Sequence, residues 1–134
     1  MCGINGFNFQ NKKVLKQMND SLRHRGPDAE GSFSSKNISL GHRRLSIIDL
    51  SEKGKQPMIY SYKNHKVRMV YNGEIYNFKE IKEELKNKGY GFKSNTDTEV
   101  ILASYIEYGK DCVKKFNGMW AFAIYDEKNK KIFL

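Results

Sequence analysis

The spacing of apolar residues near the N-terminus predicts a strand followed by a helix. Ile4, Phe7 and Phe9 lie in a short run punctuated by Gly and Asn, which is typical of a strand that begins at the very N-terminus. From Lys12 to Arg23 the apolar residues recur with helical spacing, and the pattern ends just before a Gly-Pro turn. This periodicity predicts an amphipathic helix.

Two further helices are predicted by the residues at their ends. Asn77 with Glu80 three residues later forms the capping-box pattern, and Gly89 is a typical C-terminal stop. Thr96 with Glu99 repeats the pattern before a second apolar run that also ends at a glycine. We therefore expect one helix to begin after Asn77 and another after Thr96.

Apolar runs elsewhere predict strands at residues 38–44, 66–71, 118–125 and 132–134. The run from Gly118 to Tyr125 is apolar and aromatic, as in a strand buried on both faces. Pro57 follows the polar residues 51–56 and excludes a central strand there. Because strands and helices alternate irregularly, with hairpin connections near both ends, the predicted fold class is α+β with a mainly antiparallel sheet.

Length and composition fit one folded domain over residues 1–134. The chain has 134 residues, 39% of them hydrophobic, which is close to the average for globular proteins. No apolar stretch approaches the roughly 20 residues that a membrane span requires, and no signal-peptide pattern follows Met1. We expect a soluble, cytoplasmic protein without a membrane partner. Its two cysteines lack metal-ligand spacing, which predicts a reducing compartment and no structural metal.

The formal net charge of +9 has two interpretations. The basic residues could bind an anionic partner, or they could form a solvated surface. They are scattered rather than grouped in blocks, and no nucleic-acid-binding motif accompanies them. We favour the solvated surface and expect no nucleic-acid partner, since binding to DNA or RNA would be strongly salt-dependent.

Cys2 is the first candidate for chemistry because it follows Met1 directly. Removal of Met1 would leave a cysteine at the start of the mature chain, so that a thiol and a free α-amine share one residue. An α-amine with a pKa of about 7.7 to 8.0 can take the proton of the thiol near neutral pH. The alternative is a cysteine that lies near the terminus by chance, and retention of Met1 would leave the amine unable to act as a base.

Three further candidates each have a structural alternative. Asn72-Gly73 is typical of a tight hairpin turn, but its side-chain amide and backbone N–H could also form an oxyanion hole. Arg44 could be a surface residue, or it could bind a carboxylate through two parallel hydrogen bonds. Asp97 lies in the first turn of a predicted helix, where a carboxylate complements the helix dipole, and it could also pair with a substrate ammonium.

Taken together, the motifs resemble a known family. They occur in the order Met1-Cys2-Gly3-Ile4, Arg23-His24-Arg25-Gly26-Pro27-Asp28, Gly41-His42-Arg43-Arg44-Leu45-Ser46-Ile47, Asn72-Gly73-Glu74-Ile75-Tyr76-Asn77 and Ser94-Asn95-Thr96-Asp97-Thr98-Glu99-Val100. This order resembles the class II glutamine amidotransferases, and more narrowly the N-terminal glutaminase domain of glutamine-hydrolysing asparagine synthetases. The resemblance covers essentially the whole chain.

The resemblance implies an N-terminal-nucleophile fold, a four-layer αββα sandwich of two antiparallel sheets between helices. It implies that Cys2 is the nucleophile, and that Asn72 and Gly73 form the oxyanion hole. The loop from Arg25 to Asp28 matches a supporting segment of the family. The implied substrate-binding residues are Arg44 for the α-carboxylate of glutamine, Asp97 and Glu74 for its α-ammonium, and Leu45, Ile47 and Ile48 for the pocket wall.

The resemblance also implies what the chain works with. Domains of this family continue beyond the position of Leu134 into a hairpin and an ATP-using synthetase domain, so we expect a C-terminally truncated domain that lacks its last strands. We expect no cofactor in this domain, with ATP and Mg implied for the absent synthetase domain. The expected partners are L-glutamine and a synthetase domain or subunit, and uncovered strand edges favour self-association, for example as a homodimer.

The implied function is hydrolysis of L-glutamine to glutamate and ammonia through a thioester on Cys2, for amidation of an acceptor such as aspartate. One alternative is an amidotransferase domain for a sugar or nucleotide precursor. Another is a non-catalytic remnant that binds glutamine or a protein partner.

Overall fold

A computed structural model describes residues 2–46 and 52–134. The fold is α+β, as predicted. Its strands are β1 (Gly3–Phe7), β2 (Ala29–Ser35), β3 (Ile38–Arg44), β4 (Met58–Tyr62), β5 (His65–Ile75), β6 (Gly118–Asp126) and β7 (Lys131–Phe133). Its helices are α1 (Lys12–Ser21), α2 (Phe78–Asn87) and α3 (Asp97–Tyr108), with short 3-10 helices at Arg23–Arg25, Glu52–Gly54 and Gly109–Lys115.

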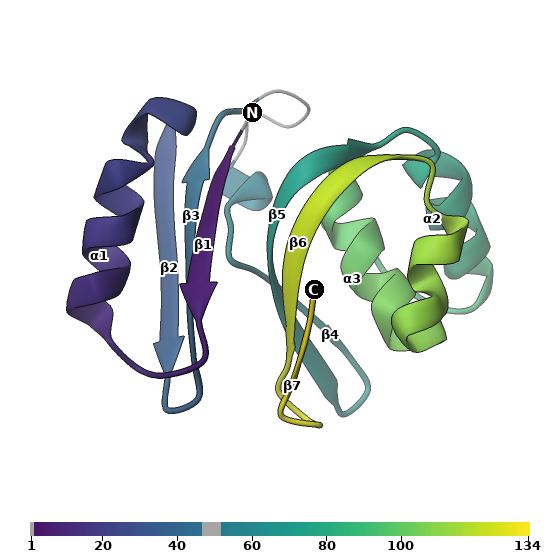
Figure 1. The fold of residues 1–134 in the computed structure, drawn as a ribbon. Helices are drawn as coiled ribbons and strands as arrows, with labels where there is room; N and C mark the ends of the chain where they lie inside the picture. Colours follow the sequence, from purple (N-terminus) through teal and green to yellow (C-terminus); the bar gives the residue numbers. More distant parts are fainter. Residues whose placement is uncertain (1, 47–51) are drawn as a thin grey trace.

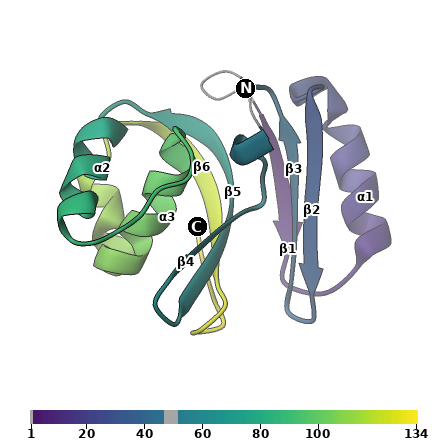
Figure 2. The ribbon, with the colours of Figure 1, turned by 180° about the vertical axis from the view of Figure 1, so that it is seen from behind.

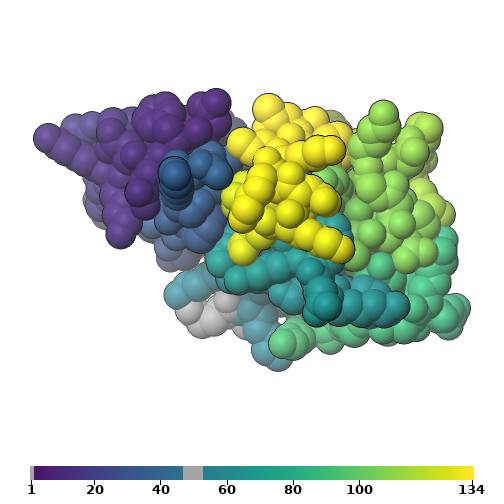
Figure 3. Space-filling view, turned by 90° about the horizontal axis from the view of Figure 1, so that it is seen from below, coloured from purple at the N-terminus to yellow at the C-terminus, as the bar shows by residue number. Residues whose placement is uncertain are grey.

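The strands form two antiparallel sheets, with the orders β1-β3-β2 and β4-β5-β6-β7. Helix α1 covers the outer face of the first sheet, and α2 and α3 cover the outer face of the second (Figures 1 and 2). Seen from below, the C-terminal segment lies between the N-terminal layers and the helices of the second sheet (Figure 3). The two predicted antiparallel sheets between helices are therefore present.

Side chains along β5 point alternately to the two faces of the sheet, and they belong to two separate hydrophobic clusters. Met69 and Tyr71 belong to the large cluster that the second sheet forms with α2 and α3. Val70 faces the opposite way and packs with Leu40 and Tyr125 in a smaller cluster that includes residues of both sheets. Successive side chains of a strand point to opposite faces, so β5 helps to join the sheet to the helices on one side and to the first sheet on the other.

The three predicted helices are confirmed, but the start of α2 differs in detail from the prediction. Thr96 caps α3 as expected, because its Oγ1 accepts a hydrogen bond from the Glu99 N–H. Asn77 precedes α2 but does not cap it with its side chain. Its Nδ2 instead donates to the Lys115 carbonyl, and its Oδ1 accepts from the Asn117 N–H. This long-range pairing replaces the local cap and ties the start of α2 to the chain before β6.

Two strands lie outside the predicted segments. β2 is rich in Ser and Gly, which are weak strand formers, and β4 begins directly after Pro57 at the edge of its sheet. β4 pairs with β5 through a tight hairpin at residues 63–64, where Lys63 has a φ of 50°. The remaining strands match the predicted segments within a few residues, although the first half of β6 has exposed positions such as Met119 and is not buried on both faces.

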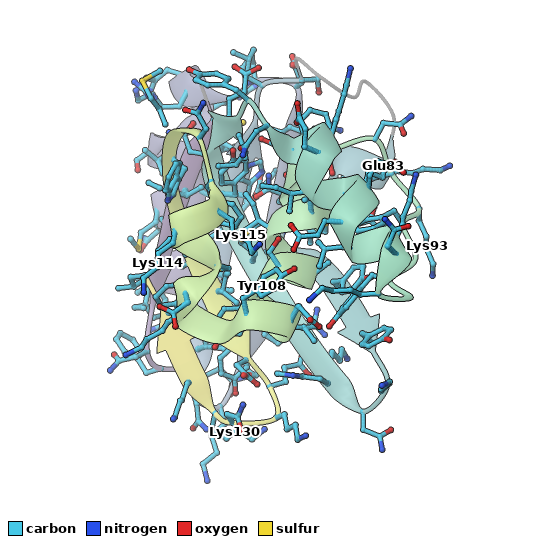
Figure 4. The ribbon with its side chains drawn as sticks, turned by 90° about the vertical axis from the view of Figure 1, so that its right-hand side faces the viewer. Glu83, Lys93, Tyr108, Lys114, Lys115 and Lys130 are labelled. Carbon is cyan, nitrogen blue, oxygen red and sulfur yellow. The ribbon has the colours of Figure 1, made fainter. Side chains whose placement is uncertain are left out.

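Lysines on the helical layer pair with neighbouring acidic residues. The Lys115 ammonium lies 3.0 Å from Glu84 Oε1 and 4.6 Å from the centroid of the Tyr108 ring (Figure 4). Lys86 pairs with Glu83 in the same layer. These pairs account for individual lysines, and the choice between a solvated surface and an anionic partner for the excess positive charge stays a prediction. None of the helices in the two described segments has the length and apolar character of a membrane span.

Candidate functional site

Residues from several elements line a cavity of about 180 Å³. It is lined by Cys2 before β1, by the end of β3, by the last third of β5 and by the start of α3. In Figures 1 and 2, β3 and β5 both end on the side of the molecule where β1 begins. Of the predicted site residues, seven line this one cavity: Cys2, Arg44, Leu45, Asn72, Gly73, Glu74 and Asp97. The other two, Ile47 and Ile48, lie outside the described residues.

The thiol of Cys2 has a defined place at the cavity wall. β1 pairs with β3 through the register Gly3↔Arg43, so the chain before β1 runs beside the end of β3. The Leu45 N–H donates to Cys2 Sγ at 3.3 Å, and Sγ lies 3.6 Å from the Leu45 carbonyl oxygen. The thiol is half-buried and forms no disulfide. Sheet pairing alone therefore brings the predicted nucleophile next to the predicted binding residues.

The predicted supporting loop holds the segment that contacts the thiol. The backbone N–H of Asp28 donates to the Arg44 carbonyl at 3.0 Å, and the Asp28 carboxylate accepts from the Ser46 N–H at 2.8 Å. These two bonds lie on either side of Leu45. Asp28 thereby fixes the backbone that contacts Cys2 Sγ.

Asn72 and Gly73 lie inside β5 and do not form a hairpin turn, so the turn interpretation is wrong. They pair with β6 through the register Asn72↔Ala121 and Gly73↔Trp120. A Cβ atom on Gly73 would lie 2.3 Å from the Met119 carbonyl oxygen, closer than any side chain can approach. Close strand pairing, rather than a positive φ, therefore requires glycine here.

β4 pairs with β5 only as far as Met69, so beyond this residue the β4-facing edge of β5 has no partner strand, and side chains bond to some of its backbone N–H groups. The Tyr71 N–H donates to Gln56 Oε1 at 2.6 Å, and the Ile75 N–H donates to Asp97 Oδ2 at 3.0 Å. N–H groups two residues apart in a strand point to the same side. The Gly73 N–H lies between these two and therefore faces the same edge, toward the cavity that Gly73 lines.

The cavity combines one cationic and two anionic side chains. Arg44 and Asp97 are both buried, with exposed fractions of 7% and 3%. Glu74 is exposed and lines the cavity from the solvent side. One guanidinium and two carboxylates suit a ligand that carries both a carboxylate and an ammonium, such as a free amino acid.

Sequence reasoning missed several cavity residues, and Tyr71 is the most consequential. Its hydroxyl donates to Asp97 Oδ2 at 2.7 Å. Burial raises the pKa of Tyr71 well above its ordinary value, and the adjacent Asp97 charge acts in the same direction. In the sequence Tyr71 is an ordinary aromatic strand residue, and no local pattern distinguishes it. Gln56, Gly54, Thr96, Thr98 and Met119 also line the cavity.

Other titratable groups do not contribute to the cavity. His42 lies on β3 with 1% of its surface exposed, and burial lowers its pKa to about 4. Burial likewise raises the pKa of the Cys112 thiol to about 12, as expected for a packed, unreactive cysteine. Within residues 2–46 and 52–134, no cluster of three or more His, Cys, Asp or Glu side chains could hold a metal ion.

Comparison with known proteins identifies the class. The family model described as "Glutamine amidotransferase domain" matches residues 1–134, and the chain belongs to this family. The fold also matches a solved structure of glutamine phosphoribosylpyrophosphate amidotransferase from Bacillus subtilis. The TM-score is 0.76 at 20% identity, and the match covers 95% of this chain and 35% of that one.

The similar sequences are more specific and point to asparagine synthetases. A Methanocaldococcus jannaschii protein named as a glutamine-hydrolysing asparagine synthetase is 48% identical over 99% of this chain and 29% of its own length. Asparagine synthetase 3 of Bacillus subtilis is 42% identical over 99% of this chain and 22% of its own length. The chain is thus a class II glutamine amidotransferase domain related to those of asparagine synthetases, and it spans less than a third of these relatives.

Proposed function

We propose that this chain hydrolyses L-glutamine to glutamate and ammonia, as the glutaminase half of an asparagine synthetase-like amidotransferase. One observation carries the proposal: a thiol, an outward-facing strand N–H, a buried arginine and two carboxylates line a single cavity. These groups suit both charged ends of a free amino acid and acyl transfer at its side-chain amide.

In the proposed reaction, removal of Met1 first frees the α-amine of Cys2, which takes the proton of the thiol. The thiolate attacks the side-chain amide carbon of glutamine, while the Asn72 amide and the Gly73 N–H donate to the developing oxyanion. The C–N bond then breaks, and the terminal ammonium protonates the departing ammonia. A γ-glutamyl thioester remains on Cys2 until water, activated by the same amine, releases glutamate.

Substrate binding follows from the charges of the cavity. Arg44 binds the α-carboxylate of glutamine, while Asp97 and Glu74 bind its α-ammonium. Asp97 supplies most of the ammonium interaction because it is buried, whereas Glu74 is exposed and its charge is screened by water. Leu45 supplies part of the wall of the pocket, and the wall role expected for Ile47 and Ile48 falls outside the described residues.

We further propose that the ammonia serves an ATP- and Mg-dependent synthetase domain or subunit with aspartate as the acceptor. The names of the similar proteins support this choice over a sugar or nucleotide acceptor. The phosphoribosylpyrophosphate amidotransferase shares only 20% identity, so it supports the fold and not an acceptor.

The test begins with the N-terminus and the nucleophile. Intact mass should show loss of Met1, and a diazo-ketone analogue of glutamine should label Cys2, as mapped by peptide mass spectrometry. The Cys2→Ala variant should release no glutamate above background while still binding glutamine. Cys112→Ala is the matched control and should retain hydrolysis, because Cys112 is buried away from the cavity. Hydrolysis by Cys2→Ala at a rate close to that of the unmutated protein would refute the proposal.

A further inference from the structure

Tyr71 links the strand that carries Asn72 and Gly73 to the carboxylate of Asp97. Its hydroxyl donates to Asp97 Oδ2 at 2.7 Å, and both side chains are 3% exposed. A hydrogen bond to a charged acceptor in such a buried place is stronger and more directional than one at the surface. The contact therefore constrains the Asp97 side chain, as well as joining β5 to α3.

The protonation state of Tyr71 makes it a permanent donor. Burial, followed by the Asp97 charge, holds the pKa of Tyr71 far above physiological pH. The hydroxyl therefore stays protonated, and its proton points to Asp97. Removal of this one oxygen would leave the aromatic ring in its packing place while deleting the contact.

The two oxygens of Asp97 are used differently. Oδ2 accepts from both the Tyr71 hydroxyl and the Ile75 N–H. No hydrogen bond among the described residues engages Oδ1. Two donors on the same oxygen fix the rotation of the carboxylate, so one oxygen serves the protein and the other is available to a ligand in the cavity that Asp97 lines.

We infer that Tyr71 is a positioning residue that orients Asp97 toward the α-ammonium of the substrate, and so makes the cavity selective for an amino-acid amide over an amide without the ammonium. This inference rests on the proposed glutaminase function. Glu74 cannot replace Asp97 in this role, because its exposed side chain discriminates weakly in water.

The test compares two substrates in the Tyr71→Phe variant of the protein with Met1 removed. One is L-glutamine, and the other is 4-carbamoylbutanoate, which is identical except that it lacks the α-ammonium. The variant should lose about tenfold in kcat/KM for glutamine, mainly through KM, since it loses one charged hydrogen bond. The value for 4-carbamoylbutanoate, or its inhibition constant where turnover is slow, should change by less than about twofold.

The matched control is Tyr60→Phe, which also removes a buried tyrosine hydroxyl. Tyr60 donates to the Gly91 carbonyl at 2.8 Å and does not line the cavity. It should leave the selectivity between the two substrates unchanged, and the unfolding midpoints of both variants show whether they are folded. In an Asp97→Asn background, Tyr71→Phe should cause no further loss of selectivity, because the oriented charge is already absent.

The outcomes separate this inference from the proposed function. Equal losses for both substrates would overturn the inference, because Tyr71 would then act on the reacting centre or on the fold as a whole. An unchanged Tyr71→Phe variant beside an active unmutated protein would also overturn it. Failure of the processed, unmutated protein to hydrolyse glutamine would instead overturn the proposed function.

Discussion

At the scale of single residues, Arg44 offers a direct test of binding. It is buried at the end of β3 and lines the cavity, where a planar guanidinium can bind both oxygens of an α-carboxylate. Arg44→Lys retains the charge but loses this geometry. We expect KM for glutamine to rise about tenfold with little change in kcat, measured by glutamate release.

The neighbouring Arg43 is the control for this prediction. Arg43 is equally buried, but it points away from the cavity and pairs with Asp20 and Glu30. Arg43→Lys should lower the unfolding midpoint and leave KM unchanged. If Arg44→Lys lowered only kcat, the carboxylate-binding role would be wrong.

Membership of the candidate site is predictable from the sequence for residues that belong to a recognisable motif. Motifs predict Cys2, Arg44 and Asp97 as site residues, and all three line the cavity. No motif predicts Tyr71 or Gln56, because their contacts are with residues distant in the sequence. A tyrosine in a strand and a glutamine before a proline have the same local appearance in any fold, so only the folded structure reveals these contacts.

At the scale of secondary-structure elements, the pairing of β5 with β6 determines the shape of the candidate oxyanion hole. A Cβ on Gly73 would lie 2.3 Å from the Met119 carbonyl oxygen and 2.6 Å from Trp120 Cα, and both contacts are with backbone atoms that cannot move away singly. We expect Gly73→Ala to destabilise the fold by about 1 to 3 kcal/mol, measured by urea unfolding, and to reduce glutamine hydrolysis.

Gly91→Ala is the matched control for Gly73→Ala, because a Cβ there meets nothing within 4 Å. It should change stability by no more than about 0.5 kcal/mol. Equal unfolding free energies for the two variants would show that strand contact does not require glycine at position 73.

The same strand shows why local signals predicted some elements and missed others. Helices α1, α2 and α3 have clear periodicity or end signals, and all were predicted. Asn72-Gly73 has the strongest local preference for a turn, yet pairing with β6 keeps it extended. Asn77 likewise gives up its local cap for backbone partners near β6. Long-range pairing overrides local propensity at these two sites. Asn72 and Gly73 line the cavity themselves, and Asn77 follows three residues after Glu74, which also lines it.

At the scale of the whole molecule, the cavity is built from residues of both sheets. The first sheet contributes Cys2 and Arg44, whereas the second contributes Asn72, Gly73 and, through α3, Asp97. Stability of the interface between the sheets is therefore a condition for the geometry of the cavity.

His42 on β3 should make that stability depend on pH. Its side chain is 1% exposed, and its Nε2 is buried without a hydrogen-bond partner among the described residues. Burial lowers its pKa from 6.5 to about 4, with the Arg44 charge acting in the same direction and a hydrogen bond to the Tyr71 backbone opposing it. In the unfolded chain His42 binds a proton below pH 6.5, whereas in the folded protein it does not until about pH 4.

A fall in pH through this window therefore favours the unfolded state, and the loss should amount to about 3 kcal/mol between pH 7 and pH 4. Urea unfolding at a series of pH values should show this slope, which His42→Gln should largely remove because glutamine does not titrate. His24→Gln, at an exposed position, is the control and should keep the slope. The decline that remains at lower pH belongs to carboxylates such as Asp126, whose pKa is lowered in the fold and whose contribution is lost as they are protonated. Parallel pH profiles for His42→Gln and the unmutated protein would show that His42 does not couple protonation to the packing of the two sheets.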